Sequence, residues 1–325
     1  MRVYSNDRFS LALPAGHRFP MSKYQLLRER VQARAAEGPV VDAAAVPLRL
    51  FEAEAATDGE LALAHDPDYI TAVVEGTLSV AAQREIGFPW SERMVERSRR
   101  SVGATIAAAR AALADGVALQ LGGGTHHAHA HKGSGFCVFN DVAVAARLMQ
   151  AEVHRLQRRL LRVWVIDLDV HQGNGTAAIF RDDPTVFTLS MHGARNFPFR
   201  KEASDLDVDL PDGCTDAPYL AALDVALAEA WRRQQLAEPP GLAFYLAGAD
   251  PHQDDRLGRL KLSTEGLAER DRRVLRALRG WRVPVALTMA GGYGHNTETT
   301  VAVHERTVTL AAEAWSDWPK APNTG

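Results

Sequence analysis

Cysteine is scarce in this sequence of 325 residues, which contains only Cys137 and Cys214 beside 12 histidines. Two cysteines cannot form a disulfide framework or a thiolate zinc site. We therefore expect a reducing, cytoplasmic location, and any bound metal must take nitrogen and oxygen ligands.

Long apolar runs are also missing, because charged residues or glycines interrupt each run well before the ~20 residues that a membrane-spanning helix requires. Residues 1–7 lack the basic segment and the apolar stretch of a signal peptide. We expect neither secretion nor insertion into a membrane.

Neither sign of charge dominates, since 37 Lys and Arg residues face 40 Asp and Glu residues and the formal net charge is −3. This balance gives no overall reason to bind nucleic acid. It favours cationic substrates only slightly. With 46% hydrophobic residues, the composition is that of a soluble globular protein, and it does not indicate an oligomeric state.

From about residue 91 onward, short apolar runs alternate with amphipathic stretches. The predicted strands are 117–121, 163–170, 186–191, 242–247 and 285–289. The predicted helices are 22–35, 91–116, 217–235, 264–278 and 297–314, with another beginning at Asn140. The alternation is typical of an α/β fold, here a single-domain open parallel sheet flanked by helices. We assign residues 1–315 to this domain and expect a flexible tail over 316–325.

Polar or glycine-rich clusters follow four of the predicted strands, at 122–127, 167–171, 248–255 and 290–294. Open parallel sheets bind ligands at the carboxyl ends of their strands. We therefore expect all four clusters to meet at one edge of the sheet.

The most informative cluster is Asp167-Leu168-Asp169-Val170-His171. The two-residue period of a strand places Asp167, Asp169 and His171 on one face. Two buried carboxylates beside an imidazole favour a divalent metal with nitrogen and oxygen ligands. The alternative is that these side chains cap helices or pair with arginines.

Two adjacent histidines, His126 and His127, follow a turn of three glycines. Because imidazole titrates near neutral pH, one or both of them can serve as acid or base. The alternative is a hydrogen-bonded loop. His129 and His131 are interpreted as solvated loop residues.

Two further candidates are weaker when they are considered alone. The pair Asp254-Asp255 is either a third metal ligand or a surface turn. Tyr293 lies between glycines, so its hydroxyl either reaches a bound carbonyl or belongs to an ordinary turn.

Together these residues resemble the zinc-dependent histone deacetylase superfamily, which has the arginase–deacetylase fold. The motifs that match in order and spacing are 122–127, 135–141, 167–175, 255–258 and 290–294. The similarity runs from the first residues to about Leu310. The short chain most resembles the class IV-type deacetylases and their bacterial relatives, the histone deacetylase-like amidohydrolases.

The resemblance implies one zinc ion per chain, bound by Asp169, His171 and Asp255, with an open position for water and substrate. Asp254 precedes Asp255 where the family usually has a small residue. Asp255 is preferred as the ligand because it directly precedes Arg-Leu-Gly.

The resemblance also implies catalytic roles. His127 is the general base, and His126 with Asp167 forms a more cationic supporting pair. Tyr293 donates a hydrogen bond to the developing oxyanion. Asn174 stands where some classes have an aspartate that supports the second histidine, a choice that other active classes share.

Phe136, with its neighbour Gly135, and Phe199 correspond to the aromatic walls that hold the lysine stem. The family also binds a structural monovalent cation, usually potassium. The residues at its positions are Asp167, Asp169, His171, Ser190 and Met191. A second cation site lacks its aromatic residue here.

We therefore predict a zinc-dependent amidohydrolase whose substrate is N-acetyl-lysine in proteins or peptides. Formyl- and lactyl-peptides and acetylpolyamines are also compatible with the motifs. Another possibility is a non-catalytic module that binds acyl-lysine. A dinuclear manganese ureohydrolase of the arginase type is disfavoured, because Gly173 replaces the further aspartate that such a site needs.

Overall fold

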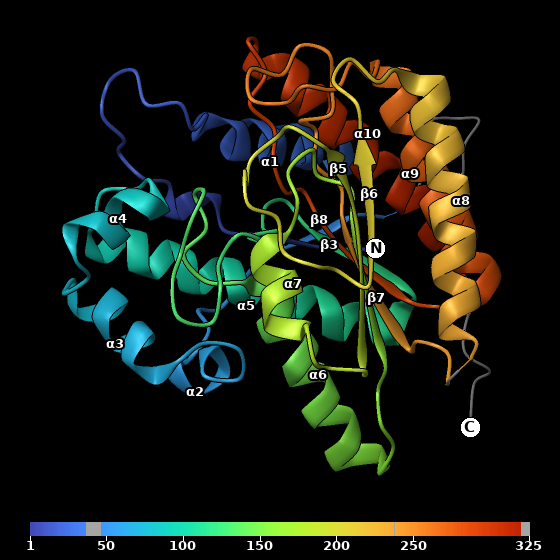
Figure 1. Ribbon diagram of the computed structural model, residues 1–325, viewed down its shortest axis with the longest axis horizontal. Coiled ribbons are helices and arrows are strands. Elements are labelled where there is room, and N and C mark those ends of the chain that lie inside the picture. The colour runs from blue at the N-terminus through green and yellow to red at the C-terminus, as the bar shows by residue number, and fades with distance from the viewer. Residues whose placement is uncertain (37–46, 237, 320–325) are drawn as a thin grey trace.

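The structure is a computed structural model that describes residues 1–36, 47–236 and 238–319. In these residues one eight-stranded sheet runs in the order β2-β1-β3-β8-β7-β4-β5-β6, with every neighbouring pair parallel. Strands lie in the middle of the molecule, with α8 and α9 on one side and α5, α6 and α7 on the other (Figure 1). The strands are β1 Arg2–Ser5, β2 Arg49–Glu52, β3 Val117–Gln120, β4 Val163–Asp167, β5 Val186–Gly193, β6 Leu206–Leu210, β7 Leu242–Leu246 and β8 Val285–Thr288. The predicted α/β fold is confirmed.

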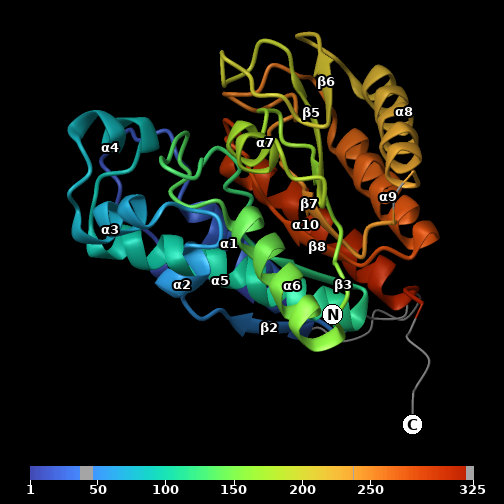
Figure 2. The same ribbon diagram turned by 60° about the horizontal axis from the view of Figure 1, so that its bottom comes forward.

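Helices cover both faces of the sheet (Figure 2). One core lies between the sheet and α1, α8, α9 and α10, and a second lies between the sheet and α2–α7. A short 3-10 helix spans Asp7–Phe9. The α-helices are α1 Ser22–Ala36, α2 Asp58–Leu61, α3 Pro67–Glu75, α4 Val80–Ile86, α5 Glu92–Asp115, α6 Asp141–Gln157, α7 Asn174–Phe180, α8 Asp216–Gln234, α9 Thr264–Trp281 and α10 Thr297–Ser316.

Strand β4 shows why its sequence is apolar at successive positions. Trp164 and Ile166 pack into the core beneath α8–α10, whereas Val163 and Val165 pack into the core on the opposite face. A strand buried on both faces has no reason to alternate polar and apolar residues. The predicted strand 163–170 ends earlier, at Asp167.

Helix ends lie where the sequence predicts them. The Ser91 side chain accepts a hydrogen bond from the Met94 N–H at the start of α5, and Asn140 accepts one from the Ala143 N–H at the start of α6. Such N-caps typically stabilise a helix by about 1 kcal/mol. Helix α5 ends at Gly116, which has a φ of 87°.

The start of the expected flexible tail, at residues 316–318, packs as part of the fold. Ser316 belongs to α10, and Trp318 is buried in the core. A Cβ on Gly116 would lie 2.0 Å from the Trp318 ring, so the glycine makes room for the indole. Apolar burial therefore fixes the start of this segment, and residues 320–325 of the expected tail lie outside the described part of the chain.

Strands β1, β2 and β6 and helices α2, α3, α4 and α7 are additions to the elements whose ranges are predicted above. Cys137 and Cys214 are both free and buried. None of the helices in the described residues is long and apolar enough to cross a membrane.

Candidate active site

The four polar clusters predicted from the sequence follow β3, β4, β7 and β8. These strands are consecutive neighbours in the sheet, in the order β3-β8-β7-β4. Because all of them are parallel, their carboxyl ends lie along one stretch of the sheet edge. The topology thus brings together segments that are more than a hundred residues apart in the sequence.

A compact acidic cluster lies at this edge. His171 Nδ1 is 3.0 Å from Asp169 Oδ1 and 3.2 Å from Asp250 Oδ2, and all three side chains are buried. One potential ligand atom from each lies within 4.8 Å of the others. Burial and the neighbouring Asp169 carboxylate raise the pKa of Asp250 to about 7.

None of the residues that the structure describes donates a well-oriented hydrogen bond to Asp250 Oδ2, although this oxygen is fully buried. Unpaired buried carboxylate oxygens are costly unless a cation neutralises them. The cluster provides nitrogen and oxygen donors, which suit a divalent cation such as zinc. The residues present therefore fit the metal that the sequence motifs imply.

Gly291 makes this close arrangement of carboxylates possible. A Cβ at that position would lie 1.9 Å from Asp250 Oδ2 and 2.6 Å from Asp169 Oδ2. The Gly291 N–H also donates to Asp169 Oδ2 over 2.7 Å. A side chain there would displace at least one carboxylate, which explains a glycine after β8.

Asp255 lies beside the cluster but not in it. Its Oδ1 accepts from the N–H groups of Leu257 and Gly258, and its Oδ2 accepts from the Tyr293 N–H over 2.6 Å. Asp255 is buried, whereas the Asp254 carboxylate is directed to the N–H of Asn296. The two adjacent aspartates thus face different surroundings.

The carboxylate that completes the compact cluster is Asp250, which we did not predict as a ligand. A signal for it exists in the sequence, because Gly248-Ala249-Asp250 directly follows strand β7. The sequence spacing does not decide whether Asp250 or Asp255 is the third ligand, because both lie in the loop that follows β7.

The two adjacent histidines have different partners. His126 Nδ1 lies 2.6 Å from Asp167 Oδ2, and His127 Nδ1 lies 2.7 Å from Asn174 Oδ1. Their rings are 4.1 Å apart. Since an amide oxygen only accepts, His127 carries its proton on Nδ1 and keeps Nε2 free.

The pKa values of these histidines move in opposite directions. Burial lowers the pKa of His126, but the charges of Asp167 and Asp169 outweigh it and raise the pKa to about 9. For His127, burial and the neighbouring cation His126 hold the pKa well below its ordinary value. At neutral pH, one ring is therefore cationic and the other is a neutral base.

Tyr293 is buried against the same site, with its ring 6.4 Å from that of His171. Burial, together with the charges of Asp169 and Asp250, raises its pKa well above the ordinary value, so the hydroxyl stays protonated. Lys23 Nζ lies 5.3 Å from the Tyr293 ring centroid and donates to the Gly292 carbonyl. We did not predict Lys23, which lies on α1.

Two phenylalanines, Phe136 and Phe197, pack against residues of the site. Phe136 lies 6.1 Å from Tyr293, and Phe197 packs edge-on against His127 at 4.9 Å. Gly135 permits this packing, because a Cβ there would lie 2.6 Å from His127 Cδ2. Phe199, the expected second wall, is 84% exposed and lies beyond Phe197. The placement differs from our expectation because two phenylalanines flank Pro198, and spacing does not choose between them.

Two more histidines, His129 and His65, lie in buried surroundings that the sequence does not predict. His129 is buried rather than solvated, and it donates from Nδ1 to the His127 carbonyl. His65 Nδ1 donates to the His129 carbonyl over 3.0 Å, and its Nε2 accepts from the Asn140 N–H over 2.8 Å. His65 therefore supports the loop that carries His126 and His127.

The potassium candidates lie on two adjacent strands. Asp167 of β4 pairs in register with Ser190 of β5, and both residues are buried next to Met191. Asp167 Oδ1 accepts from the Asp169 N–H, and Ser190 Oγ contacts His192 Nδ1 at 2.9 Å.

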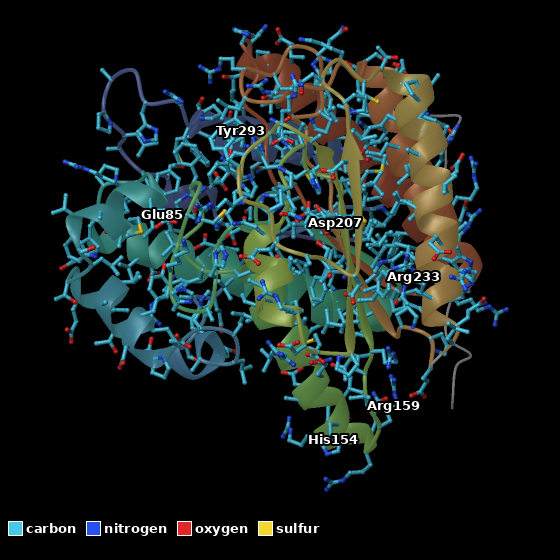
Figure 3. The ribbon with its side chains drawn as sticks, in the orientation of Figure 1. Glu85, His154, Arg159, Asp207, Arg233 and Tyr293 are labelled. Atoms are coloured by element: carbon cyan, nitrogen blue, oxygen red, sulfur yellow. The ribbon has the colours of Figure 1, made fainter. Side chains whose placement is uncertain are left out.

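Two cavities that share several lining residues lie at the histidine pair and Tyr293. The inner one has a volume of about 40 Å³, and the outer one measures about 880 Å³. Figure 3 labels Tyr293 and Glu85, which line the outer cavity from the 290–294 loop and from α4. The residues that line both cavities are His127, Gly135, Phe136, His171 and Tyr293.

Comparison with known proteins agrees with the motifs. A family model described as the histone deacetylase domain matches residues 17–309. An uncharacterized protein of Picosynechococcus is 43% identical over 93% of this chain and 95% of its own length. Histone deacetylase 2 of Arabidopsis thaliana is 34% identical over 75% of this chain, which spans 63% of that relative.

Solved structures show the same fold. An HDAC homolog from Aquifex aeolicus superposes with a TM-score of 0.75 at 24% identity, covering 98% of this chain and 84% of the other. An HDAC homolog complexed with SAHA gives a TM-score of 0.74 at 24% identity, covering 98% and 89%.

Proposed function

The chain belongs to the histone deacetylase family, whose members are zinc-dependent hydrolytic deacetylases, and we propose that it hydrolyses the amide of a short-chain N-acyl amine. The proposed substrate is N-acetyl-lysine in a protein or peptide. The observation that carries the proposal is a neutral His127 with a free Nε2, beside the Asp169–His171 cluster and Tyr293.

Asp169, His171 and Asp255 are the proposed zinc ligands, and Asp250 is the neighbour that holds His171 in place. The motif resemblance favours Asp255, whose Oδ2 keeps one lone pair beyond its hydrogen bond from the Tyr293 N–H, whereas Oδ1 already accepts two backbone hydrogen bonds. The chemistry that zinc supplies when bound is polarisation of the amide carbonyl and a lowered pKa of the attacking water.

His127 Nε2 accepts the proton of the attacking water and later returns it to the leaving amine. Asn174 fixes the tautomer that leaves Nε2 free. His126, held as a cation by Asp167, stabilises negative charge that develops in the transition state. The protonated Tyr293 hydroxyl donates a hydrogen bond to the carbonyl oxygen as that oxygen becomes anionic.

The inner cavity supports a short acyl group. A site needs at least about 10–15 Å³ of this volume for one water molecule, so about 40 Å³ accommodates only a few heavy atoms. Phe136 and Phe197 provide the aromatic sides of the entrance, and Gly135 lines it between them. Acetyl, formyl and lactyl groups are all compatible with this size.

A potassium ion at Asp167, Asp169, His171, Ser190 and Met191 is a further part of the proposal. The supporting observation is that all five residues are buried and that Asp167, at the end of β4, pairs in register with Ser190 of β5. Replacing potassium with tetramethylammonium should lower the midpoint of thermal unfolding, and an unchanged midpoint would remove the ion from the proposal.

The experiment that tests the function is hydrolysis of one peptide carrying acetyl-, formyl-, lactyl- or octanoyl-lysine, with acetylspermidine as the polyamine substrate. The zinc-loaded protein should hydrolyse the acetyl peptide and discriminate strongly against octanoyl. Binding of acetyl-lysine without turnover of any substrate at full zinc occupancy would instead identify a non-catalytic acyl-lysine module. A metal content of two manganese ions per chain would favour the ureohydrolase alternative.

A further inference from the structure

The outer cavity has a strongly basic rim. Six cationic side chains line it, and Glu85 is its one acidic lining residue in the described part of the chain. The cationic residues are Arg18, Lys132, Arg195, Arg200, Arg256 and Arg259. This local charge contrasts with the formal net charge of −3 for the whole chain.

Four separate segments supply these cations. Arg195 and Arg200 lie on the loop after β5, and Arg259 lies on the loop after β7. Arg18 precedes α1, and Lys132 follows the catalytic histidine pair. Positive charge therefore surrounds the entrance instead of forming a stripe along one element.

Few carboxylates neutralise this rim. Lys132 pairs with Glu85 at 2.7 Å, and Arg259 pairs with Asp212 at 3.1 Å. Arg195 approaches the same Asp212 carboxylate at 4.0 Å. Two acidic side chains thus serve three of the cations.

The other three cations have no acidic partner within 4 Å among the residues that the structure describes. Arg256 donates to the carbonyl oxygens of Tyr293 and Arg18, which carry no net charge. The side chains of Arg18 and Arg200 are exposed. Adjacent unneutralised cations around a concave site attract anions and raise their local concentration.

We infer that the preferred substrate presents the acyl-lysine within an acidic peptide segment, with Asp or Glu residues on both sides of it. This inference rests on the proposed function. The spread of cations around a cavity of about 880 Å³ favours an extended occupant with several carboxylates. A small molecule with one carboxylate would neutralise only part of the rim.

The inference is opposite in sign to the expectation drawn from composition. A net charge of −3 favours cationic substrates slightly. The residues near the bound substrate dominate its recognition, because exposed charges farther away than about 10 Å are screened at ordinary ionic strength.

The test uses three peptides that differ only in the residues flanking one acetyl-lysine: Glu, Gln or Lys at the two positions on either side. At low ionic strength, the Glu peptide should have a kcat/KM about tenfold above that of the Gln peptide. The Lys peptide should fall below both. The advantage should shrink in 0.5 M salt, where the charges are screened.

Substitutions of rim arginines distinguish recognition of acidic flanking residues from a general loss of activity. Arg18→Gln and Arg200→Gln should each reduce the Glu-peptide advantage about two- to fivefold and leave the Gln peptide unchanged. Arg155→Gln is the matched control, because Arg155 is exposed on α6 next to His154, which lies at the opposite end of the molecule from Tyr293 (Figure 3). It should leave all three peptides unchanged.

The Gln peptide also separates this inference from the proposed function. Failure of zinc-loaded protein to hydrolyse any of the three peptides would contradict the function itself. Hydrolysis of the Gln peptide with no advantage for Glu, or with a preference for Lys, would contradict only the inference. Free Nε-acetyl-lysine forms the fourth arm, and a kcat/KM equal to that of the Glu peptide would identify a small substrate instead.

Discussion

Protonation of His65 should destabilise the folded protein below neutral pH. The Nδ1–H of His65 donates to a backbone carbonyl, and its Nε2 accepts from the Asn140 N–H. A proton added to Nε2 would point at the Asn140 N–H, so a buried hydrogen bond would be replaced by repulsion between two donors. Burial accordingly lowers the pKa of His65 to about 4.

The sign and size of the effect follow from linkage. The folded-state pKa lies below the ordinary value of about 6.5, so the unfolded chain binds the proton first as the pH falls. Stability due to neutral His65 is present above about pH 6.5 and is lost progressively toward pH 4. Between pH 7.5 and 5.5 the loss is about 1.3 kcal/mol, and below pH 4 it reaches about 3 kcal/mol.

Urea unfolding of the wild type and of His65→Gln, followed by circular dichroism at pH 7.5 and 5.5, measures this term. Other titrating groups affect both proteins, so their contribution cancels in the difference. The free-energy advantage of the wild type should shrink by about 1.3 kcal/mol at the lower pH. His154→Gln, at an exposed position on α6, is the matched control and should show no such change.

An advantage of the wild type over His65→Gln that is the same at both pH values would refute the reasoning. It would mean that His65 titrates normally in the folded protein, or that the unfolded state preserves its environment. A loss for His154→Gln equal to that for His65→Gln would show that the effect comes from net charge rather than from the buried hydrogen bonds.

Three further predictions concern the proposed catalytic residues. His127→Ala should lower kcat at least a hundredfold while one zinc per chain is retained, and a near-normal rate would assign the base to another group. Tyr293→Phe should lower kcat about 10²- to 10³-fold with little change in KM, because the hydroxyl acts on the transition state. A change in KM alone would make Tyr293 a binding residue. Asp255→Asn should lower the zinc content measured by mass spectrometry more than Asp250→Asn does, and the reverse order would make Asp250 the third ligand.

The sheet and the location of its functional edge could be predicted from the sequence, because they depend on local patterns. A buried parallel strand such as β4 is a short apolar run, and polar residues follow it directly. Capping residues such as Ser91 and Asn140 mark helix starts with one side chain each. These signals require no knowledge of distant contacts.

The parts of the site that depend on distant contacts were not predictable in the same way. Lys23 reaches the 290–294 loop from α1, and Phe197 rather than Phe199 packs on His127. The strand β2 has mostly exposed residues, so its sequence lacks the apolar run by which buried strands are recognised. Each of these placements depends on which segment packs opposite, and spacing in the sequence does not carry that information.

The histidine pair shows most clearly how chemistry depends on such contacts. His126 and His127 are chemically identical neighbours, and both are buried. One faces a carboxylate at the end of β4, and the other faces an amide at the start of α7, only seven residues later in the chain. The carboxylate stabilises an imidazolium, whereas the amide oxygen only orients a neutral ring. The segment from Asp167 to Asn174 therefore gives the two adjacent histidines opposite protonation states. This arrangement places a neutral base beside a fixed positive charge.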